Sequence, residues 1–210
     1  MALTGLFLIL FLIVHLAGNF QLLLTKEQAE FQFNIYSRFM TSNLVIKTIS
    51  YLLYASFIAH IVVSIIITVK NRKATGGRYA YDKRSSTSSW FSRNMGVLGT
   101  IILVFLIIHM RDFWYEYKFG ALPLDAEGNK DLFRIVVSAF GQWWYVLFYV
   151  VAMIALGFHL LHGFTSAFKT LGFFPPRLAP IIYYAGIGLT LFLTAGFIII
   201  PLLVYINYHT

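Results

Sequence analysis

The chain contains no cysteine and little charge of either sign. Without cysteine it cannot form disulfides, bind an iron–sulfur cluster through thiolates or attach haem covalently through a C-x-x-C-H motif. Charged residues make up 11% of the 210 residues and hydrophobic residues 59%, which is far more apolar than a soluble domain. We therefore expect a single transmembrane domain that covers residues 1–210.

The hydrophobic residues form long uninterrupted segments. A membrane-spanning helix needs about 20 mostly apolar residues, and the segments that qualify are 3–24, 44–69, 94–118, 143–168 and 180–206. No positively charged region precedes the first segment and no small-residue cleavage site is evident, so we expect a retained helix rather than a signal peptide. The sequence predicts an all-α integral membrane protein with five transmembrane helices.

Basic residues are concentrated in two of the connections between these segments. The connection between the second and third segments has Lys70, Arg72, Lys73, Arg78, Lys83, Arg84 and Arg93 against the single acid Asp82, and the connection between the fourth and fifth has Lys169 and Arg177. The positive-inside rule places both connections, and the N-terminus, in the cytoplasm. The bias sets the topology alone, or it also provides a docking surface for a soluble partner or anionic lipid. It indicates no nucleic-acid role.

One histidine lies inside each of the first four segments: His15, His60, His109 and His159. Ionisable side chains are rare in transmembrane helices and usually mark a function. Because successive helices run in opposite directions, His15 and His109 are expected roughly 3 to 6 Å outside the midplane and the other two about as far inside it. In an up-down bundle, each pair can hold a haem iron between two imidazoles.

This arrangement predicts two noncovalent b haems, with centres roughly 10 Å apart along the membrane normal. His162, one turn beyond His159, could replace it as a ligand, contact a propionate or bond a neighbouring helix. Propionates need cations or hydroxyls at the interface, and the other candidates are Gln21, Ser92, Arg93, Arg111 and Lys169. Ordinary snorkelling at a helix end is the alternative for these cations.

A quinone site would need an apolar slot and a group that transfers protons. Near the expected outer haem, the candidates for proton transfer are Glu30 and Asp112. The alternative for both carboxylates is a solvated position at the outer end of a helix. No residue is assigned a catalytic role.

Several segments around the histidines resemble one known family. They read LTGLF and VHLAGN in the first apolar segment, AH in the second, IHMRD in the third and GFHLLHG in the fourth. Together they are similar to the cytochrome b subunit of succinate:quinone oxidoreductases, of the five-helix type with two haems. The resemblance extends over nearly the whole chain. It implies that His15 and His109 bind the distal haem iron and that His60 and His159 bind the proximal one.

The resemblance also implies a function in a respiratory chain. The chain would anchor a flavoprotein subunit and an iron–sulfur subunit on the cytoplasmic face of a bacterial inner membrane. It would carry electrons between the iron–sulfur subunit and menaquinone. The complex would act as a succinate dehydrogenase of the tricarboxylic acid cycle or, in reverse, as a fumarate reductase. The dicarboxylate site would lie on another subunit.

Three alternatives remain open at this point. The chain could be the cytochrome b anchor of a hydrogenase or a formate dehydrogenase, although the local segments match those less well. A membrane desaturase or oxygenase would need several histidine boxes, and only His159 and His162 come close to one. A proton channel or transporter would use the histidines as a relay, but the centres of the five segments hold no acid.

Overall fold

The chain is described here from a computed structural model, which defines residues 1–74 and 90–209. Arg78, Asp82, Lys83 and Arg84 of the basic connection lie outside the described residues. Within these residues, five helices are long and apolar enough to cross a membrane: Ala2–Leu23, Leu44–Lys73, Met95–Phe119, Trp143–Thr170 and Ala179–His209. The prediction of an all-α protein with five candidate spans is confirmed, with ends that shift by a few residues.

Each span is built from one or more helical elements. The first consists of α1 (Ala2–Asn19) and a 3₁₀ turn, η1 (Phe20–Leu23). The second, fourth and fifth are α3 (Leu44–Ala74), α9 (Trp143–Thr170) and α10 (Ala179–His209). The third follows the short α5 (Trp90–Arg93) and runs through α6 (Met95–His109), a π-helical segment η2 (Met110–Tyr115) and α7 (Glu116–Phe119).

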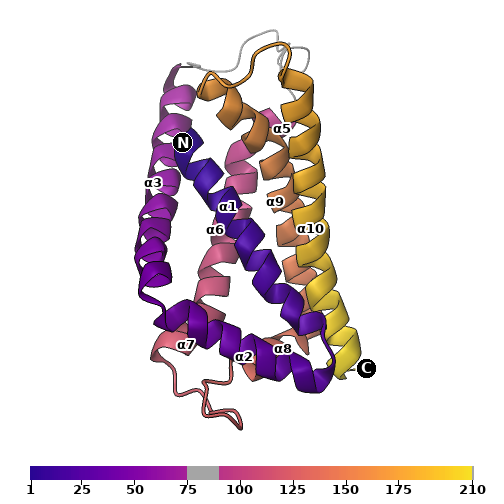
Figure 1. Ribbon diagram of the computed structural model, residues 1–210. Coiled ribbons are helices and arrows are strands. Elements are labelled where there is room, and N and C mark those ends of the chain that lie inside the picture. Colours follow the sequence, from indigo (N-terminus) through magenta and orange to yellow (C-terminus); the bar gives the residue numbers. More distant parts are fainter. Residues whose placement is uncertain (75–89, 210) are drawn as a thin grey trace.

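The N-terminus and the C-terminus lie at opposite ends of the bundle, as an odd number of spans requires (Figure 1). The connection between α9 and α10 lies at the end that holds the N-terminus, whereas α2, α7 and α8 lie at the other end. Helix α1 crosses the bundle obliquely between α3 and α10 (Figure 1). The end with the N-terminus is therefore the one to which the basic connections assign the cytoplasmic side.

Two helices at the opposite end were not predicted. Helix α2 (Lys26–Ser42) buries Ala29, Phe33 and Ser37, which are spaced four residues apart and so share one face. Helix α8 (Leu132–Phe140) begins at Asp131, whose side chain accepts a hydrogen bond from the backbone N–H of Arg134. Both signals, a four-residue period and an aspartate N-cap, are present in the sequence but are weaker than a long apolar run.

The best-packed part of the interior lies between α1, α9 and α10. Leu16 of α1 and Leu193 of α10 are fully buried, and small residues allow the helix backbones to approach closely. A Cβ atom added at Gly157 would lie 2.7 Å from Oγ1 of Thr194. By contrast, Leu53 and Leu98 are the only buried residues among the described side chains of α3 and α6 respectively. The helices that carry His60 and His109 are thus the least packed by protein.

Candidate functional site: two histidine pairs at two levels

His15 of α1 and His109 of α6 form the first histidine pair. Their ring centroids are 5.7 Å apart and the ring planes are nearly perpendicular, at 86°. Each ring is stacked on a phenylalanine of its own helix, with Phe11 5.2 Å from His15 and Phe105 5.4 Å from His109. These stacking contacts, one helical turn away, restrict the orientation of both imidazoles.

His60 of α3 and His159 of α9 form the second pair. Their ring centroids are 6.3 Å apart and their planes make an angle of 60°. A Cβ added at Gly5 would be 3.5 Å from Cε1 of His60, and one added at Gly99 would be 4.0 Å from Cε1 of His159. The second pair therefore lies beside the first turns of α1, roughly 15 Å along that helix from the level of His15.

The pairs that meet are the two matched by depth in the sequence. In each pair, one histidine has its Nδ1 atom within hydrogen-bond distance of a hydroxyl. Nδ1 of His109 lies 3.0 Å from the Tyr149 hydroxyl, and Nδ1 of His60 lies 3.2 Å from Oγ1 of Thr4. Nε2 of each ring then remains for another partner. Nδ1 of His159 is buried without a hydrogen-bond partner among the described residues.

A hydrogen-bonded chain links His109 to the C-terminal part of the third span. The Tyr149 hydroxyl lies 3.3 Å from the Tyr145 hydroxyl, which donates to Oδ2 of Asp112 at 2.8 Å. Nη1 of Arg111 donates to Oδ1 of Asp112 at 2.6 Å. Tyr145 and Tyr149 are buried, and Asp112 lies in the π-helical segment that follows His109. Sequence reasoning missed both tyrosines, although their four-residue spacing places them on one face of α9.

The geometry of both pairs is compatible with an iron between the two rings. Imidazole nitrogens bind metals at about 2 Å, and a ring nitrogen is roughly 1 Å from the ring centroid. Two imidazoles on opposite sides of one iron therefore have centroids about 6 Å apart, close to the observed 5.7 and 6.3 Å. The residues present thus fit haem iron.

The candidates for propionate contacts occupy different environments. The amide oxygen of Gln21 is buried and has no hydrogen-bond partner among the described residues. His162 and Ser92 are partly buried, whereas Arg93, Arg111 and Lys169 are exposed. Nζ of Lys169 lies 4.9 Å from the ring centroid of Phe174 in the connection to α10. Gln21 is the candidate whose burial most calls for a polar partner.

The two carboxylates proposed for proton transfer are differently placed. Glu30 is exposed on α2, and desolvation, followed by the nearby charges of Asp131, Asp125 and Glu127, raises its pKa. Asp112 is partly buried and connected to His109 through the two tyrosines. Only Asp112 is therefore joined to a histidine pair by the hydrogen bonds described above.

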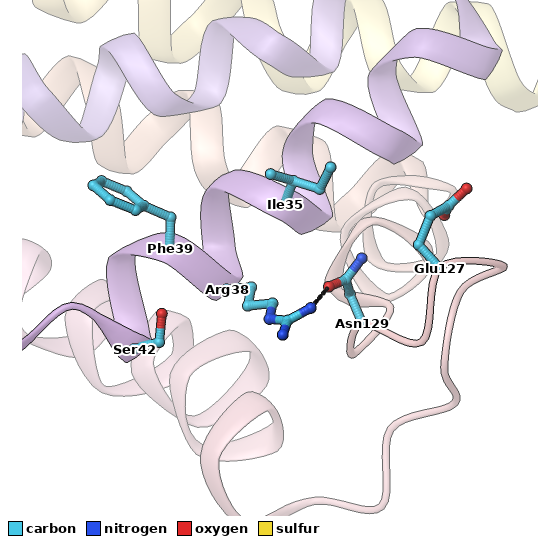
Figure 2. A pocket seen from close by; sticks show the side chains of 6 residues that line it. All are labelled: Ile35, Arg38, Phe39, Ser42, Glu127 and Asn129. Atoms are coloured by element: carbon cyan, nitrogen blue, oxygen red, sulfur yellow. Dashed lines mark hydrogen bonds between the residues drawn. The ribbon is translucent and has the colours of Figure 1, made fainter.

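A surface pocket lies at the end of the protein opposite the N-terminus, between α2 and the segment that precedes α8 (Figure 1 and Figure 2). It is lined by Ile35, Arg38, Phe39, Ser42, Glu127 and Asn129. Nη1 of Arg38 donates to Oδ1 of Asn129 at 3.0 Å, which bridges the two sides of the pocket. None of these six residues belongs to the histidine pairs. The pocket is separate from the candidate site.

His209 is the last residue of α10. Its Nε2 atom is 2.8 Å from the carbonyl oxygen of Val137, so the ring connects α10 to α8.

Searches against models of protein families, curated proteins and solved structures find no match for this chain.

Proposed function

We propose that the chain is a dihaem cytochrome b that anchors a succinate:menaquinone oxidoreductase or quinol:fumarate reductase in a bacterial inner membrane. The observation that carries the proposal is the meeting of four histidines from four spans as two pairs, each with ring centroids about 6 Å apart. The assignment to this enzyme class rests on the sequence resemblance, and the N-terminus is assigned to the cytoplasm by the basic connections.

Two protein ligands per site is the number that haem iron accepts, because the porphyrin supplies the other four nitrogens. His15 and His109 would hold the distal haem, and His60 and His159 the proximal one. When bound, the two haems supply one-electron carriers at two depths in the membrane. The histidine pairs lie roughly 15 Å apart along α1, and the tilt of that helix reduces their separation along the membrane normal.

The chain's own residues would then orient the ligands and provide a polar route at the outer end. Phe11 and Phe105 restrict the rings of His15 and His109. Asp112 is favoured over Glu30 for proton transfer to menaquinone, because it is partly buried and bonded to the Tyr145 hydroxyl. Gln21 is favoured as a propionate contact on the outer side, because its amide oxygen is buried.

The partners in this proposal are a flavoprotein subunit and an iron–sulfur subunit at the cytoplasmic face. The described basic residues at that end include Lys70, Arg72, Lys73, Lys169 and Arg177, all of them exposed. An anchor of a hydrogenase or formate dehydrogenase would share the haem ligands and differ in these soluble subunits. Their identity in the purified complex decides between the two classes.

The test is a dithionite-reduced minus oxidised visible spectrum of the purified membrane complex, with haem quantified as the pyridine haemochrome. We expect two b haems per chain, copurification of flavoprotein and iron–sulfur subunits, and succinate-dependent reduction of a menaquinone analogue. A folded preparation that contains no haem would refute the dihaem proposal. Copurification of two haems with a hydrogenase subunit would support the dihaem cytochrome b but refute its assignment to a succinate:menaquinone oxidoreductase.

A further inference from the structure

The hydrogen-bonded chain between Asp112 and His109 has a definite direction. A carboxylate only accepts hydrogen bonds, and both oxygens of Asp112 do so, from Arg111 and from Tyr145. The single hydroxyl hydrogen of Tyr145 is therefore directed to Asp112. The contact of 3.3 Å between the two tyrosines must then be a donation from Tyr149 to the oxygen of Tyr145.

The direction of the hydrogen bond between Tyr149 and His109 follows from the same argument. Because the hydrogen of Tyr149 is directed to Tyr145, its oxygen is left to accept a hydrogen bond. The donor at 3.0 Å is Nδ1 of His109, which must carry the proton. A neutral imidazole has one N–H, so Nε2 of His109 has a free lone pair. This is the form that binds a metal through Nε2.

We propose that Asp112, Tyr145 and Tyr149 are positioning residues that hold His109 in the tautomer with Nε2 free to bind iron. The proposal rests on the haem binding proposed above. Of the three residues, only Tyr149 contacts His109 directly, and Tyr145 and Asp112 act through Tyr149. Hydrogen bonds from a metal-bound histidine to outer partners fix its tautomer and orientation and raise its basicity. Here the outer partner is a buried tyrosine pair that ends on a carboxylate.

The second histidine pair has a similar but shorter chain of hydrogen bonds. The hydroxyl of Thr4 donates to the backbone carbonyl of Met1 at 2.9 Å, so its oxygen is left to accept from Nδ1 of His60. The partner of His60 is thus a neutral hydroxyl, whereas the partner of His109 belongs to a chain that ends on an anion. We expect the stronger polarisation at His109, because hydrogen bonds to charged groups are the stronger ones.

The test is a spectroelectrochemical titration of both haems in the purified complex, comparing wild type with Tyr149→Phe. A more basic ligand stabilises ferric iron over ferrous iron. Loss of the Tyr149 hydroxyl should therefore raise the midpoint potential of the distal haem while both haems remain bound. A tenfold change in relative affinity corresponds to about 59 mV for a one-electron couple, and we expect a shift on that order.

Three other variants make the result specific. Asp112→Asn should raise the midpoint potential of the distal haem by a smaller amount. The asparagine amide can donate to the Tyr145 hydroxyl, so the direction of the hydrogen bonds is no longer fixed. Thr4→Val should shift only the proximal haem. Tyr54→Phe is the matched control: the Tyr54 hydroxyl accepts from Nε1 of Trp114 at 2.8 Å, and its loss should move neither potential.

The outcomes separate this inference from the proposed function. If wild type holds two haems and both Tyr149→Phe and Asp112→Asn leave the distal potential unchanged, the positioning role is wrong while the cytochrome assignment stands. If Tyr149→Phe does not fold, the Asp112→Asn titration decides in the same way. If wild type holds no haem, the proposed function fails and this inference fails with it.

Discussion

His60 and His159, from the second and fourth spans, have ring centroids 6.3 Å apart, and Nδ1 of His159 is buried without a partner among the described residues. His162 lies one turn further along the same helix and is partly buried. The geometry therefore selects His159 rather than His162 as the partner of His60.

This selection predicts different haem contents for two single substitutions. In the dihaem cytochrome proposed above, His159→Gln should reduce the haem content from two per chain to one, because the proximal iron would lose a ligand. His162→Gln should retain both haems, and pyridine haemochrome quantification against protein measures the difference. Loss of one haem in His162→Gln, with two retained in His159→Gln, would transfer the ligand role to His162.

A pair of glycines on α10 tests how closely the helices pack. A Cβ added at Gly196 would lie 2.7 Å from Cδ2 of the fully buried Leu16, whereas one added at Gly188 would meet nothing within 4 Å. We expect Gly196→Ala to destabilise the protein by about 1–3 kcal/mol, because overpacking forces neighbours to shift. Gly188→Ala should be neutral or stabilise by up to about 1 kcal/mol, the helix-propensity difference. Thermal unfolding in detergent compares them, and equal stabilities would contradict the close contact of α1 with α10.

The attachment of α2 to α8 depends on one buried asparagine. Nδ2 of Asn34 donates to Oδ1 of Asp131 at 3.1 Å, and its Oδ1 accepts from the backbone N–H of Phe133 at 3.0 Å. Asn34→Ala removes both bonds, and the N–H of Phe133 loses its acceptor, which should cost about 1–3 kcal/mol. Faster limited proteolysis of α2 should accompany the loss. Gln28→Ala, at an exposed position on the same helix, is the control and should behave as wild type.

Glu30 gives stability a predictable pH dependence. Desolvation, with the charges of Asp131, Asp125 and Glu127, raises its pKa in the folded state. The folded protein thus holds this proton more tightly than the unfolded chain does. The contribution of protonated Glu30 to stability is present in full below the pKa that Glu30 has in the unfolded chain. It is lost as the pH rises through the higher pKa of Glu30 in the folded protein.

We therefore expect Glu30→Gln to be more stable than wild type at neutral pH, with the difference shrinking as the pH falls below the ordinary range of a glutamate. Unfolding temperatures measured at neutral and acidic pH provide the comparison. A difference that grows on acidification would reverse the sign of the Glu30 contribution.

The spans could be predicted because apolar length alone determines which helices can cross a bilayer. Helices α2 and α8 were not predicted, because their sequence signals are weak and contacts between distant residues, such as Asn34 with Asp131, hold them together. A polar side chain buried by a partner far along the chain has the same sequence signature as an exposed one.

Some features of the candidate site could likewise be predicted from the sequence, and others depend on the folded structure. The positions of His15, His60, His109 and His159 along their segments determine which of them share a depth, because the helical rise is constant. The role of Tyr149 depends on which face of α9 meets α6, and no rise or period specifies that. Asp112 and Glu30 are equivalent in the sequence and differ only in the folded chain, where Tyr145 donates to Asp112 alone.

The sequence by itself thus determined the number of spans, the asymmetry of basic residues between the two ends and the depth of each histidine, since all three follow from composition along a single helix axis. The tertiary structure decided how far apart the paired rings lie, which hydroxyls contact them and in which direction the hydrogen bonds run. Those properties depend on the rotation of each helix about its own axis, and that rotation is set by packing between helices.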